Sequence, residues 1–207
     1  MTMAQRKRQL VAGELTEAAL RLLARKGFDA VTIDEIVATA GVSRRTFFRY
    51  FASKEDVVVQ FLAEMGDGIR AELAGRPAAE SPAEALRHAV RVPLDACADH
   101  SDRALGVVQL ILRTPALRAR FLERQAEWRD GLTAELASRL GLDAETDLYP
   151  RLAAGMAVST FDTVLHRWSE SGGEISPAAL IEQAFTLLAP SLDAPVRQTA
   201  HDAESGR

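Results

Sequence analysis

Apolar residues recur every three or four positions along most of the chain, the spacing that places them on one face of an α-helix. Glycine, proline, serine and threonine residues separate the successive apolar stretches. The pattern predicts a first helix that ends at Gly27, a helix from Thr32 to Ala40 and another that begins after Ser43. Further helices are expected to run from Lys54 to near Gly75 and Pro77, to begin at Pro82 and after Asp102, to run from Pro115 to Gly141 and from Glu145 to Ser171, and to begin at Pro177. The expected fold class is therefore all-α.

Two of these helices are joined by a very short turn. Thr32 and Glu35 have the T-x-x-E spacing of a capping box, in which each side chain accepts a hydrogen bond from the backbone N–H of the other residue. Gly41 can adopt the positive φ that ends a helix, and Ser43 offers the hydroxyl that caps the next one. Two short helices joined by such a turn predict a helix-turn-helix, whose second helix enters the major groove of DNA.

The helix that begins at residue 44 is predicted to be apolar on one side and basic on the other. Phe47 and Phe51 fall on the side that packs against the protein. The side chains expected to face outward or to flank that surface are Arg44, Arg45, Thr46, Phe48 and Arg49. Guanidinium groups suit guanine edges and phosphates, a threonine hydroxyl can pair with either kind of base edge, and an aromatic ring can meet a thymine methyl group. A solvated basic helix is the alternative interpretation.

The segment from Gly41 to Val57, GVSRRTFFRYFASKEDV, closely resembles the helix-turn-helix of TetR-family regulators, and TIDEIVATAG precedes it at the expected place. The resemblance implies an all-helical, homodimeric and usually repressing transcription factor with a small-molecule pocket in its C-terminal domain. The family often has tyrosine where this chain has Phe48, so a phosphate contact through that hydroxyl is lost. Lys54 is expected to grip a phosphate together with backbone N–H groups. The expected DNA-binding residues are Thr32, Ser43, Arg44, Arg45, Thr46, Phe48, Arg49, Tyr50 and Lys54.

Charge divides the chain into two parts. Residues 1–54 hold 10 Lys and Arg against 5 Asp and Glu, whereas the remainder holds 15 against 24, so a net charge of +5 precedes one of −9. A basic segment supplies the attraction to phosphate that dominates DNA affinity, and an acidic remainder is repelled by the duplex. We therefore expect residues 1–54 to be the DNA-binding domain, 55–192 a ligand-binding and dimerisation domain, and 193–207 a disordered tail.

Chemistry other than DNA binding finds little support in the sequence. The four histidines lack Cys or His neighbours at metal-ligand spacing, and no nucleophile or phosphate-loop motif occurs, so we expect neither an enzyme nor a cofactor. The one cysteine, Cys97, fits a reducing cytosol, either as an inert buried thiol or as a redox switch. No signal-peptide core and no apolar run near ~18 residues is present, so we expect a cytoplasmic protein without a membrane partner.

The C-terminal part carries two expected surfaces. Apolar side chains that could line a pocket, or equally form ordinary core, are Met65, Val108, Leu112, Phe121, Trp128, Met156 and Phe161. The last two helices, the first of them rich in small residues, resemble one half of a four-helix dimer interface. Its expected residues are Ala157, Val164, Trp168, Ile181, Phe185 and Leu188. Pro93 should kink or split its helix and open a cavity.

Three polar groups allow two interpretations each. Arg6, Lys7 and Arg8 form either a disordered arm that touches DNA on binding or a solvated terminus. A cluster on the helix from 115 either holds an anionic head group or is a solvated face, and consists of Arg118, Arg120 and Arg124. Asp162 and His166 either orient a polar ligand group or form a plain surface pair.

The preferred hypothesis is a homodimeric repressor that binds a palindromic double-stranded operator and is released by a small apolar effector. The motif and the C-terminal pattern also resemble the subgroup with an acyl-CoA-like ligand-binding domain, which makes an acyl-CoA one candidate effector. Two other hypotheses stay open: an architectural DNA-binding protein without an effector, and a helical carrier or enzyme that retains the fold.

Overall fold

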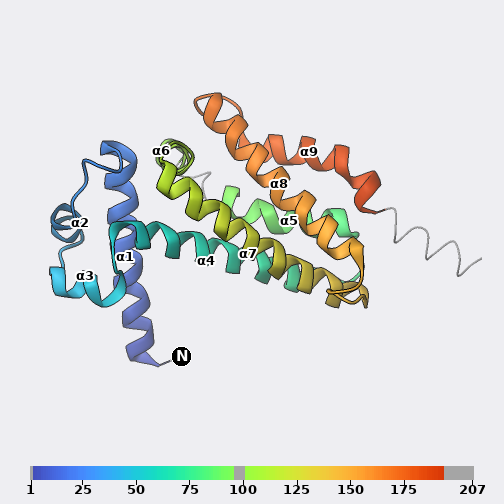
Figure 1. Cartoon of the computed structure of the whole chain (residues 1–207), viewed down its shortest axis with the longest axis horizontal. Coiled ribbons are helices and arrows are strands. Elements are labelled where there is room, and N and C mark those ends of the chain that lie inside the picture. Colours follow the sequence, from blue (N-terminus) through green and yellow to red (C-terminus); the bar gives the residue numbers. More distant parts are fainter. Residues whose placement is uncertain (1, 96–100, 194–207) are drawn as a thin grey trace, which may run out of the picture. The chain divides into compact units, whose positions relative to one another are not determined.

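The computed structural model describes residues 2–95 and 101–193, whose secondary structure consists of helices joined by turns, without strands, which confirms the all-α fold (Figure 1). The helices are α1 (Met3–Lys26), α2 (Ile33–Ala40), α3 (Arg44–Tyr50), α4 (Lys54–Gly75), α5 (Pro82–Asp95), α6 (Ser101–Arg113), α7 (Pro115–Leu140), α8 (Leu148–Glu170) and α9 (Pro177–Leu192). Among the described residues, no helix is long and apolar enough to cross a membrane.

The helices pack into two compact units. The first comprises Met1–Glu64 and His100–Arg124, and the second comprises Met65–Asp99 and Gln125–Arg207. The expected domain boundary lay at residue 54, but Val57 and Val58 of α4 are fully buried, and α6 packs against α1. The first unit therefore takes in half of α4, all of α6 and the start of α7, and α4 contributes residues to both units.

In the first unit, α1 packs against α2 and α6. Leu15 and Leu23 of α1 and Ile36 of α2 are fully buried. A Cβ atom added to Gly106 of α6 would lie 3.1 Å from the Cβ atom of Ala24, so α6 approaches α1 closely where both side chains are small. This core is the support on which α2 and α3 are held.

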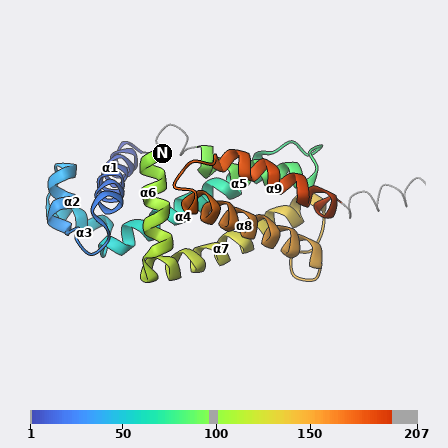
Figure 2. The same cartoon turned by 90° about the horizontal axis from the view of Figure 1, so that it is seen from above.

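In the second unit, α5, α8 and α9 pack against one another (Figure 2). Asp193, at the end of α9, links that helix to the start of α5. Its Oδ1 atom accepts a hydrogen bond of 3.0 Å from the backbone N–H of Ala83. The Tyr149 hydroxyl donates to the carbonyl of Leu192, and burial together with Asp193 raises the pKa of Tyr149 to about 12. Asp193 thus belongs to the folded unit, whereas the rest of the expected tail, 194–207, lies outside the described residues.

The connection between α4 and α5 is held by Arg139 of α7. Its guanidinium donates to the carbonyls of Arg76 at 2.8 Å, Glu80 at 3.2 Å and Pro77. Arg76 in turn pairs with Glu72 and Glu80. The Pro77 carbonyl also accepts from the Glu80 N–H at 3.1 Å, so Arg139 adds to a turn that is already hydrogen-bonded and links it to α7.

Two local expectations can be compared with the described helices. The helix α5 includes Pro93 and continues to Asp95, so the expected split does not occur within the described residues. Of the two interpretations of Arg6, Lys7 and Arg8, the disordered arm does not hold, because these exposed residues belong to α1, which begins at Met3. Cys97, His100 and His201 lie outside the described residues.

Candidate nucleic-acid interface

The turn between α2 and α3 has the geometry that the sequence predicts. The Thr32 hydroxyl accepts from the Glu35 N–H at 3.2 Å, and the Glu35 carboxylate accepts from the Thr32 N–H at 3.0 Å. Gly41 has φ 67°, and the Val42 N–H donates to the Val37 carbonyl at 3.0 Å. The Ser43 hydroxyl accepts from the N–H of Thr46 at 3.1 Å. Both helices are therefore capped from within the motif, and their relative orientation is fixed by the short turn.

Aromatic rings anchor α3 to the first unit. Phe47 and Phe51 are 0% and 1% exposed, and their ring centroids lie 5.6 Å apart. Phe48 meets the edge of the Phe47 ring at 5.4 Å but remains 49% exposed. One face of α3 is thus fixed in the core, which confirms the predicted burial of Phe47 and Phe51.

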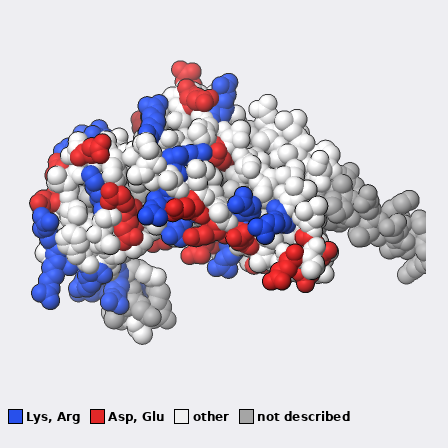
Figure 3. Space-filling view, viewed as in Figure 1, with Lys and Arg blue, Asp and Glu red and all other residues white. Residues whose placement is uncertain are grey.

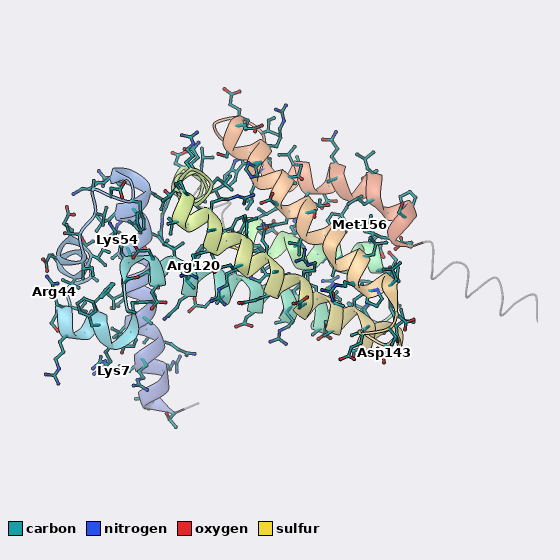
Figure 4. All side chains as sticks on the ribbon, viewed as in Figure 1. Lys7, Arg44, Lys54, Arg120, Asp143 and Met156 are labelled. Carbon is teal, nitrogen blue, oxygen red and sulfur yellow. The ribbon has the colours of Figure 1, made fainter. Side chains whose placement is uncertain are left out.

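The opposite face of α3 presents arginines to the outside. The Arg44 Nη1 atom donates to both carboxylate oxygens of Asp34, at 3.0 and 2.9 Å, and the guanidinium lies 5.9 Å from the Phe48 ring centroid (Figure 4). Arg49 lies over the Tyr50 ring at 4.9 Å and donates to its hydroxyl at 3.1 Å. Arg45 is exposed and makes no side-chain bond or ion pair within the described part of the chain. All three guanidinium groups are exposed, and Arg44 and Arg49 are in addition held by Asp34 and Tyr50.

The hydroxyl residues of the expected set are accessible but already bonded. Ser43 and Thr46 place their hydroxyl oxygens 3.0 Å apart, and the Thr32 hydroxyl also lies 3.4 Å from the Glu35 carboxylate. The Tyr50 hydroxyl accepts from Arg49. Each of these hydroxyls thus has a capping or pairing role within the chain.

The Lys54 side chain is bonded within the chain. Its ammonium donates to the carbonyls of Phe28 at 2.6 Å and Val31 at 3.1 Å, and it lies 4.4 Å from the Phe28 ring centroid. An ammonium has three N–H donors, and two of them are used here. The side chain therefore ties the start of α4 to the segment between α1 and α2, and one N–H donor of the half-buried ammonium stays available for the expected phosphate contact.

A second brace joins α1 to α2. The Lys26 ammonium lies 2.5 Å from the Glu35 carboxylate, which also accepts the Thr32 N–H. The hydrogen bonds from Lys26 and Thr32 hold the pKa of the Glu35 carboxyl below its ordinary value. At neutral pH the Glu35 carboxylate is charged, so it can accept from the Thr32 N–H and pair with Lys26 at the same time.

The expected pocket residues are distributed over both units. Val108, Leu112 and Phe121 belong to the first, whereas Met65, Trp128, Met156 and Phe161 belong to the second. Within the second unit, the Trp128 and Phe161 rings meet edge to face with centroids 6.0 Å apart. Trp128 also lies against Gly66 of α4, where an added Cβ atom would be 2.1 Å from the indole Nε1 atom. These contacts form apolar core around the middle of α7 and α8.

The expected dimer residues lie mostly inside the protomer. Five of the six are buried by the chain itself: Ala157, Val164, Trp168, Ile181 and Phe185. Leu188 is half-buried. The helical periodicity identified apolar positions on α8 and α9, but it could not show which face packs inward. Leu148, Leu152 and Leu187 of the same helices are 76%, 55% and 75% exposed.

The remaining polar groups have partners within the chain, some at the surface and some, such as the half-buried Asp162 and the buried Gln125, below it. Arg120 pairs with Glu123 at 2.8 Å, and Arg118 lies 5.4 Å from the Phe121 ring centroid. Asp162 accepts from the Gln125 amide at 3.0 Å and lies 3.8 Å from His166. The described residues contain no group of three or more His, Cys, Asp or Glu side chains placed to hold a metal ion.

The sequence did not reveal which groups within the chain accept hydrogen bonds from Arg44 and Lys54. Asp34 accepts Arg44 from the preceding helix, and the carbonyls of Phe28 and Val31 accept Lys54. One signal was present: a lysine at the first position of a helix opposes the helix dipole, which indicates that a contact from elsewhere holds it there. Nothing in the sequence marked Asp34 as the partner of Arg44.

A capped helix-turn-helix with outward arginines, carried by a helical unit and followed by a second helical unit, defines a DNA-binding transcriptional regulator. The family model for bacterial regulatory proteins of the tetR family matches residues 15–61, and the model for the MftR C-terminal domain matches residues 80–193. The chain belongs to the TetR family of transcriptional regulators.

Individual relatives agree with this assignment. The HTH-type transcriptional regulator TcmR of Streptomyces glaucescens is 33% identical over 79% of this chain and 75% of its own length. The putative mycofactocin biosynthesis transcriptional regulator MftR of Mycobacterium tuberculosis is 31% identical over 91% of this chain and 94% of its own length. Among solved structures, the regulator FadR of Bacillus subtilis in complex with stearoyl-CoA has the same fold, with a TM-score of 0.64, 23% identity, and coverage of 85% of this chain and 96% of FadR.

Proposed function

We propose that the protein is a homodimeric repressor that binds a palindromic operator through α3 and is released by a small apolar effector. The observation that carries this proposal is the row of Arg44, Arg45 and Arg49 on the outer face of a helix whose other face is fixed in the core. In a dimer with two-fold symmetry, two such helices read successive major grooves ~34 to 36 Å apart.

The operator is found by selecting duplexes from a random-sequence pool with the purified protein. We expect the selected duplexes to contain an inverted repeat and to bind more tightly than unselected duplexes in fluorescence anisotropy titrations. Equal affinity for selected and unselected DNA would instead indicate an architectural DNA-binding protein. A protein that retains no duplex at low salt would be a carrier with this fold.

Arg45→Ala tests direct reading of the operator. Arg45 is exposed and engaged by no described side chain, so it can donate two hydrogen bonds to a guanine edge. We expect the variant to lose roughly 1 to 3 kcal/mol of preference at one base position in each half-site while its affinity for unselected DNA changes little. Anisotropy titrations with single-base variants of the selected duplex measure this effect. Arg21→Ala, on the exposed face of α1, is the control and should leave the preference intact.

The dimer interface is assigned to the outer faces of α8 and α9. Leu148, Leu152 and Leu187 are large apolar side chains that stay exposed on these two helices, and exposed apolar surface marks candidate protein interfaces. The small residues between them, such as Gly155 and Ser159, allow the helices of two copies to approach closely. The proposed interface therefore lies on the two helices that the sequence indicated. It uses their exposed leucines in place of the expected residues that are buried within the protomer.

Leu152→Glu combined with Leu187→Glu should convert the dimer into a folded monomer, because both carboxylates would be desolvated without partners in the interface. Sedimentation velocity measures the change in mass, and circular dichroism confirms that the helices persist. Leu122→Glu, on an exposed position of α7, is the matched control and should remain dimeric. If the double variant keeps the mass of a dimer, the interface must lie on another surface.

An acyl-CoA is the proposed class of effector. The support is the likeness of fold to FadR, solved with stearoyl-CoA, and the apolar core around Trp128 and Phe161 into which an acyl chain could insert. Because α4 carries residues of both units, a ligand that favours another position of α4 would alter the DNA-binding unit. Native mass spectrometry of the purified protein tests for a retained ligand. Stearoyl-CoA should then lower the affinity for the selected duplex, and an unchanged affinity would exclude it as the effector.

A further inference from the structure

The described side chains in the first two turns of α1 are exposed rather than packed in the core. The helix begins at Met3, but among its side chains whose burial is described the first buried one is Leu15, preceded by the half-buried Val11 and Ala12. Met3 and Leu10 are 86% and 63% exposed. At 1.5 Å per residue, the part of α1 that precedes Val11 is about 12 Å long. Packing within the chain therefore does not account for the composition of this segment.

This segment carries three consecutive cations, Arg6, Lys7 and Arg8. All three are exposed, none makes a side-chain bond or ion pair within the described residues, and no acidic residue precedes Glu14. The positive end of the helix dipole lies at the same end of α1, so three cations there oppose the local stability of the helix. A sequence that breaks a local stability rule indicates a function at that place.

The cationic segment lies on the same compact unit as the recognition helix. Figure 1 shows the N-terminal end of α1 reaching past α3, and Figure 3 shows Lys and Arg side chains gathered at that end of the unit. Helix α1 is held to α2 by packing and by the Lys26–Glu35 ion pair, and α2 is held to α3 by the capped turn. The three cations thus have a fixed position relative to the outward arginines of α3.

We propose that Arg6, Lys7 and Arg8 bind the phosphate backbone beside the groove that α3 enters. This inference rests on the proposed DNA-binding function and adds a second contact surface to it. The contact is with the backbone, because an α-helix with its side chains is ~10 to 12 Å wide and the minor groove only ~6 Å wide. Phosphate contacts of this kind fix the position of the protein and carry no base preference.

The salt dependence of binding tests the proposal. Neutralising one phosphate of B-DNA changes the slope of log K against log salt by ~0.9, so three contacts contribute about 2.7 for each chain. The variant Arg6→Gln, Lys7→Gln and Arg8→Gln removes the charges and keeps good helix formers. Anisotropy titrations of the selected duplex between 50 and 200 mM NaCl should show the slope reduced by about 2 to 3 for each chain. The ratio of the wild-type association constant to that of the triple variant should therefore fall about forty-fold for each chain between 50 and 200 mM NaCl.

The control is Arg21→Gln with Arg25→Gln, which removes two exposed cations from the other end of the same helix. The proposal predicts an unchanged slope for this control and unchanged base preferences for both variants. Trimming the selected duplex outside the half-sites should weaken the wild type but not the triple variant.

A wild-type slope in the triple variant would overturn the inference and leave DNA binding by α3 standing. An equal change of slope in the control would also overturn it, since net charge alone would then explain the effect. If the wild type itself selects no duplex, the proposed function fails and this inference fails with it.

Discussion

Lys54→Met should lower the free energy of unfolding by about 2 to 4 kcal/mol. The ammonium donates to two backbone carbonyls, and hydrogen bonds from a charged group contribute ~1.5 to 3 kcal/mol each before the loss is reduced by partial hydration. The contact with the Phe28 ring adds a further cation–π attraction, whereas methionine keeps the apolar stem and supplies no donor. Urea unfolding followed by far-ultraviolet circular dichroism measures the change.

Lys7→Met is the matched control, because Lys7 is an exposed lysine of the same unit without a described partner. Its unfolding free energy should stay within about 0.5 kcal/mol of wild type, as is usual for surface substitutions. If Lys54→Met unfolds like wild type and binds all duplexes more weakly, the sequence-based assignment of Lys54 to a phosphate would be restored. A loss of stability instead identifies Lys54 as the residue that holds α4 to the α1–α2 segment.

Gly66→Ala should destabilise the protein by ~3 kcal/mol, the upper end of the usual cost of overpacking a core. The new Cβ atom would lie 2.1 Å from the Nε1 atom and 2.2 Å from the Cδ1 atom of Trp128. Trp128 is 6% exposed and packs edge to face against Phe161, so its ring is enclosed and cannot move aside without displacing other core side chains. The same unfolding measurement applies.

Gly68→Ala provides the control within the same helix. No atom lies within 4 Å of a Cβ atom added there, so the substitution should stabilise α4 by up to about 1 kcal/mol through helix propensity. In a Trp128→Leu background, Gly66→Ala should lower the free energy of unfolding by less, because the indole atoms that the new Cβ atom would overlap are absent. Equal costs in both backgrounds would show that the destabilisation does not arise from the Trp128 contact.

Local sequence signals predicted the recognition motif correctly because its geometry is determined by residues close together in the chain. The capping box of Thr32 and Glu35, the positive φ of Gly41 and the cap at Ser43 each involve contacts within a few residues. The bounds of α4 also followed from its apolar spacing, since Lys54–Gly75 is the observed helix. Such features require no knowledge of the rest of the fold.

Periodicity was less informative where a helix has more than one apolar face. Both α8 and α9 carry apolar residues on inner and outer sides, so the spacing of Val164 and Phe185 suited a dimer interface as well as it suited the core. Only the packing of α5 against α8 and α9 shows that these two side chains point inward and that Leu152 and Leu187 point outward.

The sequence by itself determined the all-α class, the capped turn, and the burial of Phe47 and Phe51 beneath an arginine-rich face, because helix periodicity and capping are local properties of the chain. The tertiary structure decided that the Lys54 ammonium lies beside the carbonyls of Phe28 and Val31, that Gly66 faces the Trp128 ring, and that the basic start of α1 is helical. Those features depend on which distant carbonyl, ring or helix lies beside each residue, and that is fixed only when the whole chain packs.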